Sequence, residues 1–218
     1  MSQQKSDYES DADIDTTLDD LPDEETVQAT AERLRDNGFN VIVVDTGDQA
    51  VDAIQSQIPA DASVMNGHST TLEEIGFVDH LNGDDHDWEN LAGQVWDIDD
   101  DAARQQFRRE AQTADYFLGS VNAIAETGEL VAADASGSRI GAYPFAAGNL
   151  LLVSGVNKIV DDLDAALDRL EEFVFPLEDA RAQDAYGAGS VVAKQLVYRQ
   201  ETEEGRTTVV LVRDDLGY

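Results

Sequence analysis

The sequence predicts an α/β fold built on a mainly parallel β-sheet. Amphipathic helical segments alternate along the chain with short apolar segments, such as Val41–Val44 and Tyr116–Gly119. These apolar segments lack the in–out alternation of a half-exposed strand, which is typical of strands covered on both faces. Helices that alternate with buried strands indicate a parallel sheet whose strands are joined by crossover helices.

The expected elements follow one another in a regular order. A helix is predicted from Asp23, because acidic residues fill its first turn and Gly38 provides a stop signal, and the strand at Val41–Val44 follows it. We then expect a helix at about 48–58, a strand at 63–65, a short helix from about Thr71, a helix at about 99–113, a strand at 116–119, paired strands at 130–132 and from Ile140 around a turn at 135–138, a core strand at 150–153, an amphipathic helix at 161–174 and a last strand at 207–212. The stretch 176–193 shows no clear pattern.

The first 22 residues differ in composition from the rest of the chain. They combine low hydrophobicity with many acidic side chains, as in segments that bury too little apolar surface to fold. We therefore predict a disordered acidic tail at 1–22 and a single domain at 23–218. A domain of roughly 200 residues buries about 70% of the surface of its unfolded chain.

The net charge of −32 arises from 46 acidic and 14 basic residues. Such a charge repels itself at low salt and is tolerated where molar salt shortens the screening length to about 3 Å. The composition therefore predicts adaptation to a high-salt cytoplasm, as in a halophilic archaeon. It also argues against nucleic-acid binding, which needs a basic face that so few cations do not provide.

The chain contains no cysteine. This excludes disulfides, thiolate nucleophiles and iron–sulfur clusters held by cysteines of this chain. Its apolar runs are too short to cross a membrane, and its acidic first residues lack the features of a signal peptide. We therefore expect a cytoplasmic protein that has no membrane contact.

The first candidate binding segment joins the predicted strand at 63–65 to the short helix after it. It contains Asn66, Gly67, His68, Ser69, Thr70 and Thr71. Main-chain N–H groups at a helix start, together with nearby hydroxyls, form a natural pocket for a phosphate or carboxylate. The alternative is that Thr70 or Thr71 only caps the helix, with Glu73 or Glu74 completing a capping box.

The second candidate segment follows the predicted strand at 116–119. It contains Ser120, Asn122, Glu126, Thr127 and Gly128. Open α/β sheets bind their ligands at the carboxyl ends of their strands. Glu126, set among alanines and a glycine, is a candidate desolvated carboxylate that acts as acid, base or nucleophile. The alternative is that residues 126–128 form only a surface turn.

The third candidate segment follows the predicted strand at 150–153 and contains Asn157 and Lys158. This composition has nearly eliminated lysine, so a lysine in an apolar segment is expected to have a task. Lys158 is predicted to hold a carboxylate or phosphate or, alternatively, to form a structural ion pair with a nearby acid. Arg139, which follows a Ser-Gly-Ser turn, is a second candidate contact for an anion.

Histidine and aspartate gather between His80 and Asp87. These residue types bind divalent metals, but their spacing matches neither a helical ligand pair nor a calcium loop. A solvated loop is the competing interpretation, and we predict no metal site. A Ser-His-Asp hydrolase is disfavoured, because the chain lacks a G-x-S-x-G motif and all its histidines lie between 68 and 86.

Taken together and in this order, these segments resemble the LUD domain family, which includes lactate utilization protein C. The matching stretches are 66–76, 122–131, 137–139 and 154–160, with weaker likeness at 175–177 and 209–217. The chain departs from the family in one respect. Many members carry a cysteine-rich segment after a Pro-Leu-Asn-Ala-Lys-Arg-like stretch, whereas no cysteine follows Pro176–Arg181 here.

The resemblance implies a three-layer Rossmann-like sandwich, similar to sugar-phosphate isomerases, glucosamine-phosphate deaminases and coenzyme A transferases. It also implies an accessory, ligand-binding role in the oxidation of L-lactate to pyruvate, in a complex whose iron–sulfur oxidoreductase partners carry the clusters. No cofactor is expected on this chain itself. Two other functions stay open: an enzyme that resembles coenzyme A transferases or acts on sugar phosphates through Glu126, and a non-catalytic interaction module.

Overall fold

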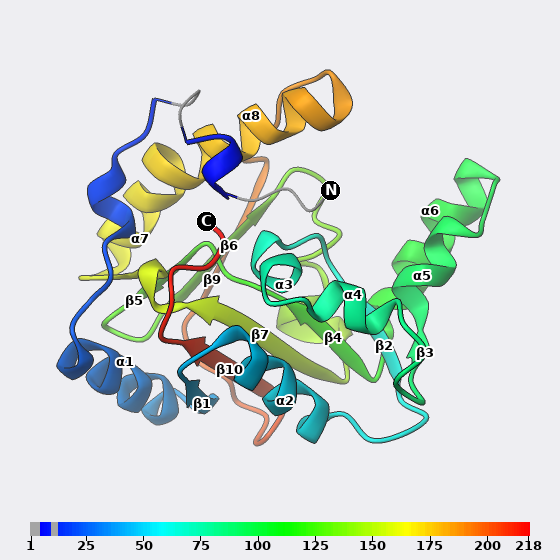
Figure 1. Ribbon diagram of the computed structural model, residues 1–218, viewed down its shortest axis with the longest axis horizontal. Helices are drawn as coiled ribbons and strands as arrows, with labels where there is room; N and C mark the ends of the chain where they lie inside the picture. Colours follow the sequence, from blue (N-terminus) through cyan, green and yellow to red (C-terminus); the bar gives the residue numbers. More distant parts are fainter. Residues whose placement is uncertain (1–4, 10–12) are drawn as a thin grey trace.

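The computed structural model describes residues 5–9 and 13–218. Its centre is a parallel sheet of six strands in the order β1-β10-β7-β4-β2-β3 (Figure 1). The strands are β1(Asn40–Val44), β2(Ser63–Asn66), β3(Glu89–Asn90), β4(Tyr116–Gly119), β7(Asn149–Gly155) and β10(Thr207–Val212). The predicted α/β class is thus confirmed, and helices flank the sheet as in a three-layer Rossmann-like sandwich.

Each face of the parallel sheet buries alternate side chains of its strands. Leu151 and Val210 pack on one face with apolar side chains of α2, α3 and α4, whereas Leu150 and Val209 pack on the opposite face with those of α1. These helices are α1(Glu24–Asp36), α2(Gly47–Gln57), α3(Thr70–Glu74) and α4(Phe77–Leu81). The strands are apolar without alternation because both faces are covered.

A second, four-stranded sheet lies beside the first in the order β8-β5-β6-β9. Its strands are β8(Ile159–Val160), β5(Ala123–Ala125), β6(Leu130–Asp134) and β9(Lys194–Tyr198). The predicted pairing of 130–132 with a strand from Ile140 is wrong, because β6 pairs with β5 and β9 instead. The chain after Ile140 forms the π-helical turn η4(Ala142–Ala146), which contains Pro144, a residue unable to donate a ladder hydrogen bond.

One unbroken helical run covers the far side of the second sheet. It consists of α7(Leu163–Arg169), the π-helical turn η6(Leu170–Val174) and α8(Phe175–Tyr186). Pro176 has no N–H and leaves the carbonyl four residues earlier without its helical partner. The π-helical turn ends two residues before this proline, and the freed Glu172 carbonyl accepts a hydrogen bond from the Asp15 main-chain N–H at 3.2 Å.

The described part of the acidic N-terminal segment is folded against the domain, unlike the disordered tail that composition predicts. It forms the 3₁₀ turns η1(Lys5–Asp7) and η2(Thr16–Asp19). Asp19 pairs with Lys5 and with the fully buried Arg169 of α7. Specific partners therefore anchor a stretch whose average composition is unfavourable for folding. Residues 1–4 and 10–12 of the predicted tail lie outside the described residues.

The remaining helical segments are α5(Leu91–Trp96), α6(Asp101–Glu110), η3(Ala111–Thr113) and η5(Val156–Lys158). Figure 1 shows α6 extending away from the sheets. Within residues 5–9 and 13–218, no helix combines the length and apolar character needed to cross a membrane.

Candidate functional site

A cavity of about 360 Å³ lies where the carboxyl ends of β2, β4 and β7 meet the second sheet and α8. Because these strands are parallel, the segments that follow them converge at the same edge of the sheet, where open α/β folds bind ligands. The polar and charged side chains that line the cavity are His68, Ser69, Thr70, Thr71, Ser120, Asn122, Asp134, Ser136, Ser138, Arg139, Lys158, Glu178, Arg181, Tyr186, Ser190 and Tyr218.

Lys158 lies at the base of the cavity with its side chain almost fully buried. Its Nζ donates to Thr71 Oγ1 at 3.0 Å and Ser120 Oγ at 3.2 Å. It also lies 3.1 Å from the main-chain oxygens of Val121 and Tyr218, so its N–H groups, at most three, are shared among four acceptors. Four protein oxygens therefore surround this nitrogen, and two of them belong to Thr71 and Ser120, which also line the cavity.

Burial and then the nearby Arg169 guanidinium hold the pKa of Lys158 well below its ordinary value. The lysine is thus the structural centre of a polar network rather than an exposed ion for a ligand. Its hydrogen bonds connect α3, the end of β4 and the last residue of the chain as given. Lys158 contacts the cavity mainly by orienting the hydroxyls of Thr71 and Ser120.

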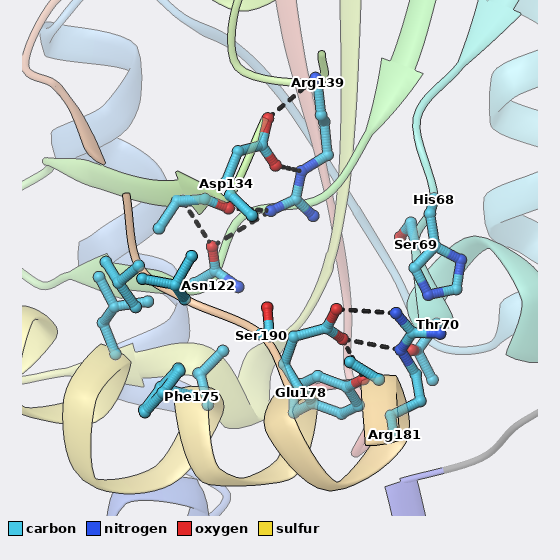
Figure 2. A pocket seen from close by; sticks show the side chains of 18 of the residues that line it. His68, Ser69, Thr70, Asn122, Asp134, Arg139, Phe175, Glu178, Arg181 and Ser190 are labelled. Atoms are coloured by element: carbon cyan, nitrogen blue, oxygen red, sulfur yellow. Dashed lines mark hydrogen bonds and ion pairs between the residues drawn. The ribbon is translucent and has the colours of Figure 1, made fainter. Parts of the chain in front are cut away.

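Arg139 and Asn122 form the polar wall opposite α8 (Figure 2). Arg139 Nη2 donates to the Ala133 carbonyl at 2.7 Å and more weakly to Asn122 Oδ1 at 3.4 Å. Asp134 holds the same arginine, with Oδ1 3.3 Å from Nε and Oδ2 accepting from the Arg139 main-chain N–H at 2.9 Å. Nη1 donates no hydrogen bond to any described residue, so one end of the guanidinium is available.

The orientation of the Asn122 amide follows from its partners. Oδ1 accepts a 2.8 Å hydrogen bond from the Ala133 main-chain N–H, which only donates, so this atom is the oxygen. The other amide atom, Nδ2, is therefore a donor, and no described residue accepts a hydrogen bond from it. In Figure 2 the Asn122 nitrogen points toward the cavity centre.

Glu178 and Arg181 form a second ion pair on α8, across the cavity from Arg139 (Figure 2). Arg181 Nε and Nη2 each donate to one Glu178 carboxylate oxygen at 2.7 Å, and Tyr218 Oη donates to the same carboxylate at 2.9 Å. Burial alone raises the pKa of Glu178, but the hydrogen bonds from Arg181 and Tyr218 outweigh it and lower that pKa. Glu178 is thus an ionised, paired carboxylate.

Apolar side chains form the rest of the wall on the helical side. They are Leu170, Val174, Phe175, Ala182 and Val192. Leu170 and Val174 belong to the π-helical turn, and Phe175 begins α8. The cavity therefore has a charged, hydrogen-bonding part and an apolar part.

The first predicted segment contributes only partly to the cavity. His68, Ser69, Thr70 and Thr71 line it, while Asn66 and Gly67 do not. Ser69 caps α3 by accepting from the Leu72 N–H at 3.3 Å, so the cap is one residue earlier than expected. A Cβ at Gly67 would lie 2.7 Å from Arg139 Cγ, so glycine here gives Arg139 its path to the cavity.

The second predicted segment divides at β5. Ser120 and Asn122 line the cavity, but Glu126, Thr127 and Gly128 lie outside it. Glu126 and Thr127 are exposed in the tight turn between β5 and β6, as in the alternative interpretation of this segment. The catalytic role of Glu126 stays a prediction, and this cavity does not bring a ligand to it.

Asn157, predicted to bind a ligand beside Lys158, also lies outside the cavity and is fully buried. Its Nδ2 donates to Asp19 Oδ1 at 2.8 Å, and its Oδ1 accepts from the Leu216 N–H at 3.2 Å. Asn157 thus ties the N-terminal segment to the end of the chain.

The histidine-rich loop forms an aromatic cluster. His86 stacks on Trp88 with ring centroids 4.8 Å apart, and its Nε2 is 2.9 Å from the Leu81 carbonyl. His80 lies edge-on to the same tryptophan. Among the described residues, no three His, Cys, Asp or Glu side chains are grouped to hold a metal ion.

Several lining residues carry no signal that sequence patterns detect. Asp134 is the last residue of β6, which carries no functional motif, while Glu178 and Arg181 lie in a stretch without a clear pattern. The i, i+3 spacing of Glu178 and Arg181 is the one available clue, since it places both on one helix face.

Comparisons with known proteins agree with this architecture. A family model described as the LUD domain matches residues 27–212. The crystal structure of a DUF162 family protein from Deinococcus radiodurans is similar in fold, with a TM-score of 0.50 and 15% sequence identity over 88% of this chain and 99% of that chain. No protein with curated information matches the sequence significantly.

Proposed function

We propose that this chain, which belongs to the LUD domain family, is an accessory, ligand-binding component of L-lactate utilisation. In this proposal the cavity binds an organic anion, and iron–sulfur partner proteins carry the electrons. The observation that supports it best is the pair of hydrogen-bond donors, Arg139 Nη1 and Asn122 Nδ2, that face one enclosed space without protein acceptors.

The charges around the cavity favour an acceptor as the ligand. Asp134 and Glu178 are each held by an arginine, and Asp134 also accepts from main-chain N–H groups. These carboxylates are therefore occupied, whereas the two donors are free. Both donors face the cavity, where an anionic or carbonyl oxygen of a ligand can accept a hydrogen bond from each.

The lactate role and the partners rest on family membership and composition. A chain without cysteine holds no cysteine-ligated cluster, so redox steps take place in other subunits. The excess of acidic residues supports a high-salt cytoplasm as its location.

Thermal unfolding in molar KCl with added ligand tests the proposal. Lactate, pyruvate, longer 2-hydroxy acids, sugar phosphates and coenzyme A are added in turn. A ligand at about 100 times its Kd adds about 2.7 kcal/mol, which raises the Tm of a chain this long by about 5–10 °C. Arg139→Gln is expected to abolish the shift, whereas Arg199→Gln, at an exposed arginine paired with Glu129, is expected to retain it. An equal shift in both variants, or no shift with any ligand, would contradict the proposal.

The same assay addresses the enzyme hypothesis. Because Glu126 lies outside the cavity, Glu126→Gln is expected to bind ligand like the unaltered protein. Incubation with acyl-coenzyme A and then hydroxylamine shows whether Glu126 forms an acyl anhydride. Modification of Glu126 in that experiment would instead support the coenzyme A transferase-like enzyme.

A further inference from the structure

We propose that the cavity recognises an organic monocarboxylate larger than lactate, whose carboxylate lies between Asn122 and Arg139 and whose apolar body lies along η6 and α8. The inference rests on the proposed function and deepens it by naming the class of ligand. It follows from three observations: a fixed pair of donors, a balance of charge, and a separate apolar wall.

The donor pair is built into the fold. Asn122 is nine-tenths buried, and both its main-chain groups are bonded, its N–H to the Val131 carbonyl at 2.8 Å and its carbonyl to Arg169 Nη1 at 2.5 Å. Its side-chain oxygen accepts from the Ala133 N–H. The free Nδ2 therefore keeps one direction, toward the cavity.

Arg139 is held with similar precision. Its Nη2 and Nε face the Ala133 carbonyl and the Asp134 carboxylate, so Nη1 is the end that stays available. Nη2 also approaches the Asn122 amide oxygen, which places the two free donors on neighbouring groups. Two adjacent N–H donors match the two oxygens of a carboxylate.

The charge balance favours a carboxylate over a phosphate. Asp134 and Glu178 offset the charges of Arg139 and Arg181. Lys158 is enclosed by four protein oxygens, and burial disfavours its charged form. The cavity thus has little excess positive charge for a dianion, while a monoanion needs only the two free donors.

The size and the apolar wall indicate a ligand larger than a three-carbon acid. A volume of about 360 Å³ lies within the range of about 300–1,000 Å³ that is typical of sites for drug-sized ligands. Phe175 lies on the helical side of this volume, away from Arg139 (Figure 2), and Leu170 and Val174 line the cavity from the neighbouring turn η6. Lactate bound at the donor pair would leave these side chains in contact with water.

Calorimetric titration of the full chain in molar KCl provides the test. The ligands are lactate, 2-hydroxybutyrate, 2-hydroxyhexanoate and 3-phenyllactate, with phenyl phosphate as the dianionic comparison. Each buried methylene contributes about 0.8 kcal/mol, so affinity is expected to rise about fourfold per added methylene. Phenyl phosphate is expected to bind more weakly than 3-phenyllactate.

Three variants separate the two parts of the cavity. Asn122→Asp keeps the size of the side chain and the oxygen that accepts from Ala133, but replaces the free donor with an acceptor. This variant is expected to weaken the binding of every acid by at least about tenfold. Ala182→Leu narrows the apolar part and is expected to weaken the binding of the long acids while leaving the binding of lactate unchanged. Val192→Ser, in the loop after α8, is expected to act in the same direction without crowding the core.

The outcomes distinguish this inference from the proposed function. Equal affinity for lactate and the long acids would overturn the inference and leave an anion site in place. Unchanged binding in Asn122→Asp would overturn it too, because the carboxylate would then lie elsewhere. Binding of phenyl phosphate but of no carboxylic acid would overturn the inference and leave an anion site, whereas binding of none of these ligands would overturn the proposed function itself.

Discussion

Substitution of Asp19 by alanine tests whether the acidic N-terminal segment is part of the fold. Asp19 Oδ1 accepts from Asn157 Nδ2 at 2.8 Å and pairs with the Arg169 guanidinium, and Oδ2 pairs with Lys5. The Arg169 side chain is 0% exposed. Asp19→Ala leaves this guanidinium buried with only main-chain acceptors, the carbonyls of Leu18 and Asn122.

The expected cost follows from that burial. Removing one partner of a buried ion pair typically costs about 3–5 kcal/mol, because the remaining charge is uncompensated. For a chain of about 150–250 residues each kcal/mol lowers the Tm by about 2–4 °C, so Asp19→Ala should lower it by about 6–20 °C. Lys5 contributes less to this difference, since it keeps Asp215 as a partner.

Thermal unfolding followed by circular dichroism in molar KCl measures this effect. Asp20→Ala is the matched control, because the neighbouring Asp20 is exposed. The double variant Asp19→Ala with Arg169→Met should regain much of the stability, since apolar replacement of a whole buried pair is often neutral. Equal Tm values for Asp19→Ala and Asp20→Ala would refute the reasoning and restore the disordered tail that composition predicts.

Two further predictions concern charge. Glu201→Gln should lower the free energy of unfolding by about 3 kcal/mol, because it leaves the buried Arg206 without its carboxylate. A lower Tm reports this loss. Burial raises the pKa of Glu201, but hydrogen bonds from Tyr198 and Thr207 outweigh it and lower the pKa from 4.5 to about 2. The stabilisation by Glu201 is therefore complete above pH 4.5 and lost as the pH falls toward 2. The difference in Tm between the unaltered protein and Glu201→Gln should narrow over that range, and a constant difference in Tm contradicts this account. Second, Tm should rise as KCl increases from about 0.1 to 1 M, where the screening length falls from about 10 to 3 Å, and a Tm independent of salt contradicts adaptation to high salt.

The parallel sheet was predictable because its signal is local. A strand buried on both faces is apolar at every position, as at Val41–Val44, and needs no knowledge of its neighbours. The helix starts are local too, as the Asp23 cap of α1 shows by accepting from the Thr26 N–H at 2.8 Å. The second sheet was missed, because β9 joins β6 across a long stretch of sequence and begins with exposed polar residues.

The N-terminal segment and the 176–193 stretch were not predictable for a shared reason. The Pro176 ring interrupts the helical pattern, and the carbonyl that it frees is satisfied by Asp15, far away in the sequence. Composition cannot reveal a hydrogen bond between a helix and an acidic segment. The sequence of each stretch alone is unfavourable for folding, whereas in the structure a donor of one stretch satisfies an acceptor beside the other.

The candidate site was predictable on one side only. Residues that follow strands were recognised because the carboxyl ends of parallel strands converge, and His68, Ser120 and Lys158 lie at the cavity as that rule requires. The rule fails for Glu126, because β5 leaves the parallel sheet and carries its turn away from this edge. The α8 side was not predictable, since nothing local shows that the helix faces a cavity.

Asn122 connects the two halves of this molecule that sequence reasoning treats separately. Its side chain offers a donor to the cavity, while its main-chain carbonyl accepts from Arg169, whose other partner is Asp19. The position of the donor thus depends on an ion pair with the N-terminal segment. Because a buried guanidinium needs its carboxylate, the segment is held in place by the same contact that fixes Asn122. An acidic stretch that composition assigns to the solvent therefore supports the geometry of the candidate site.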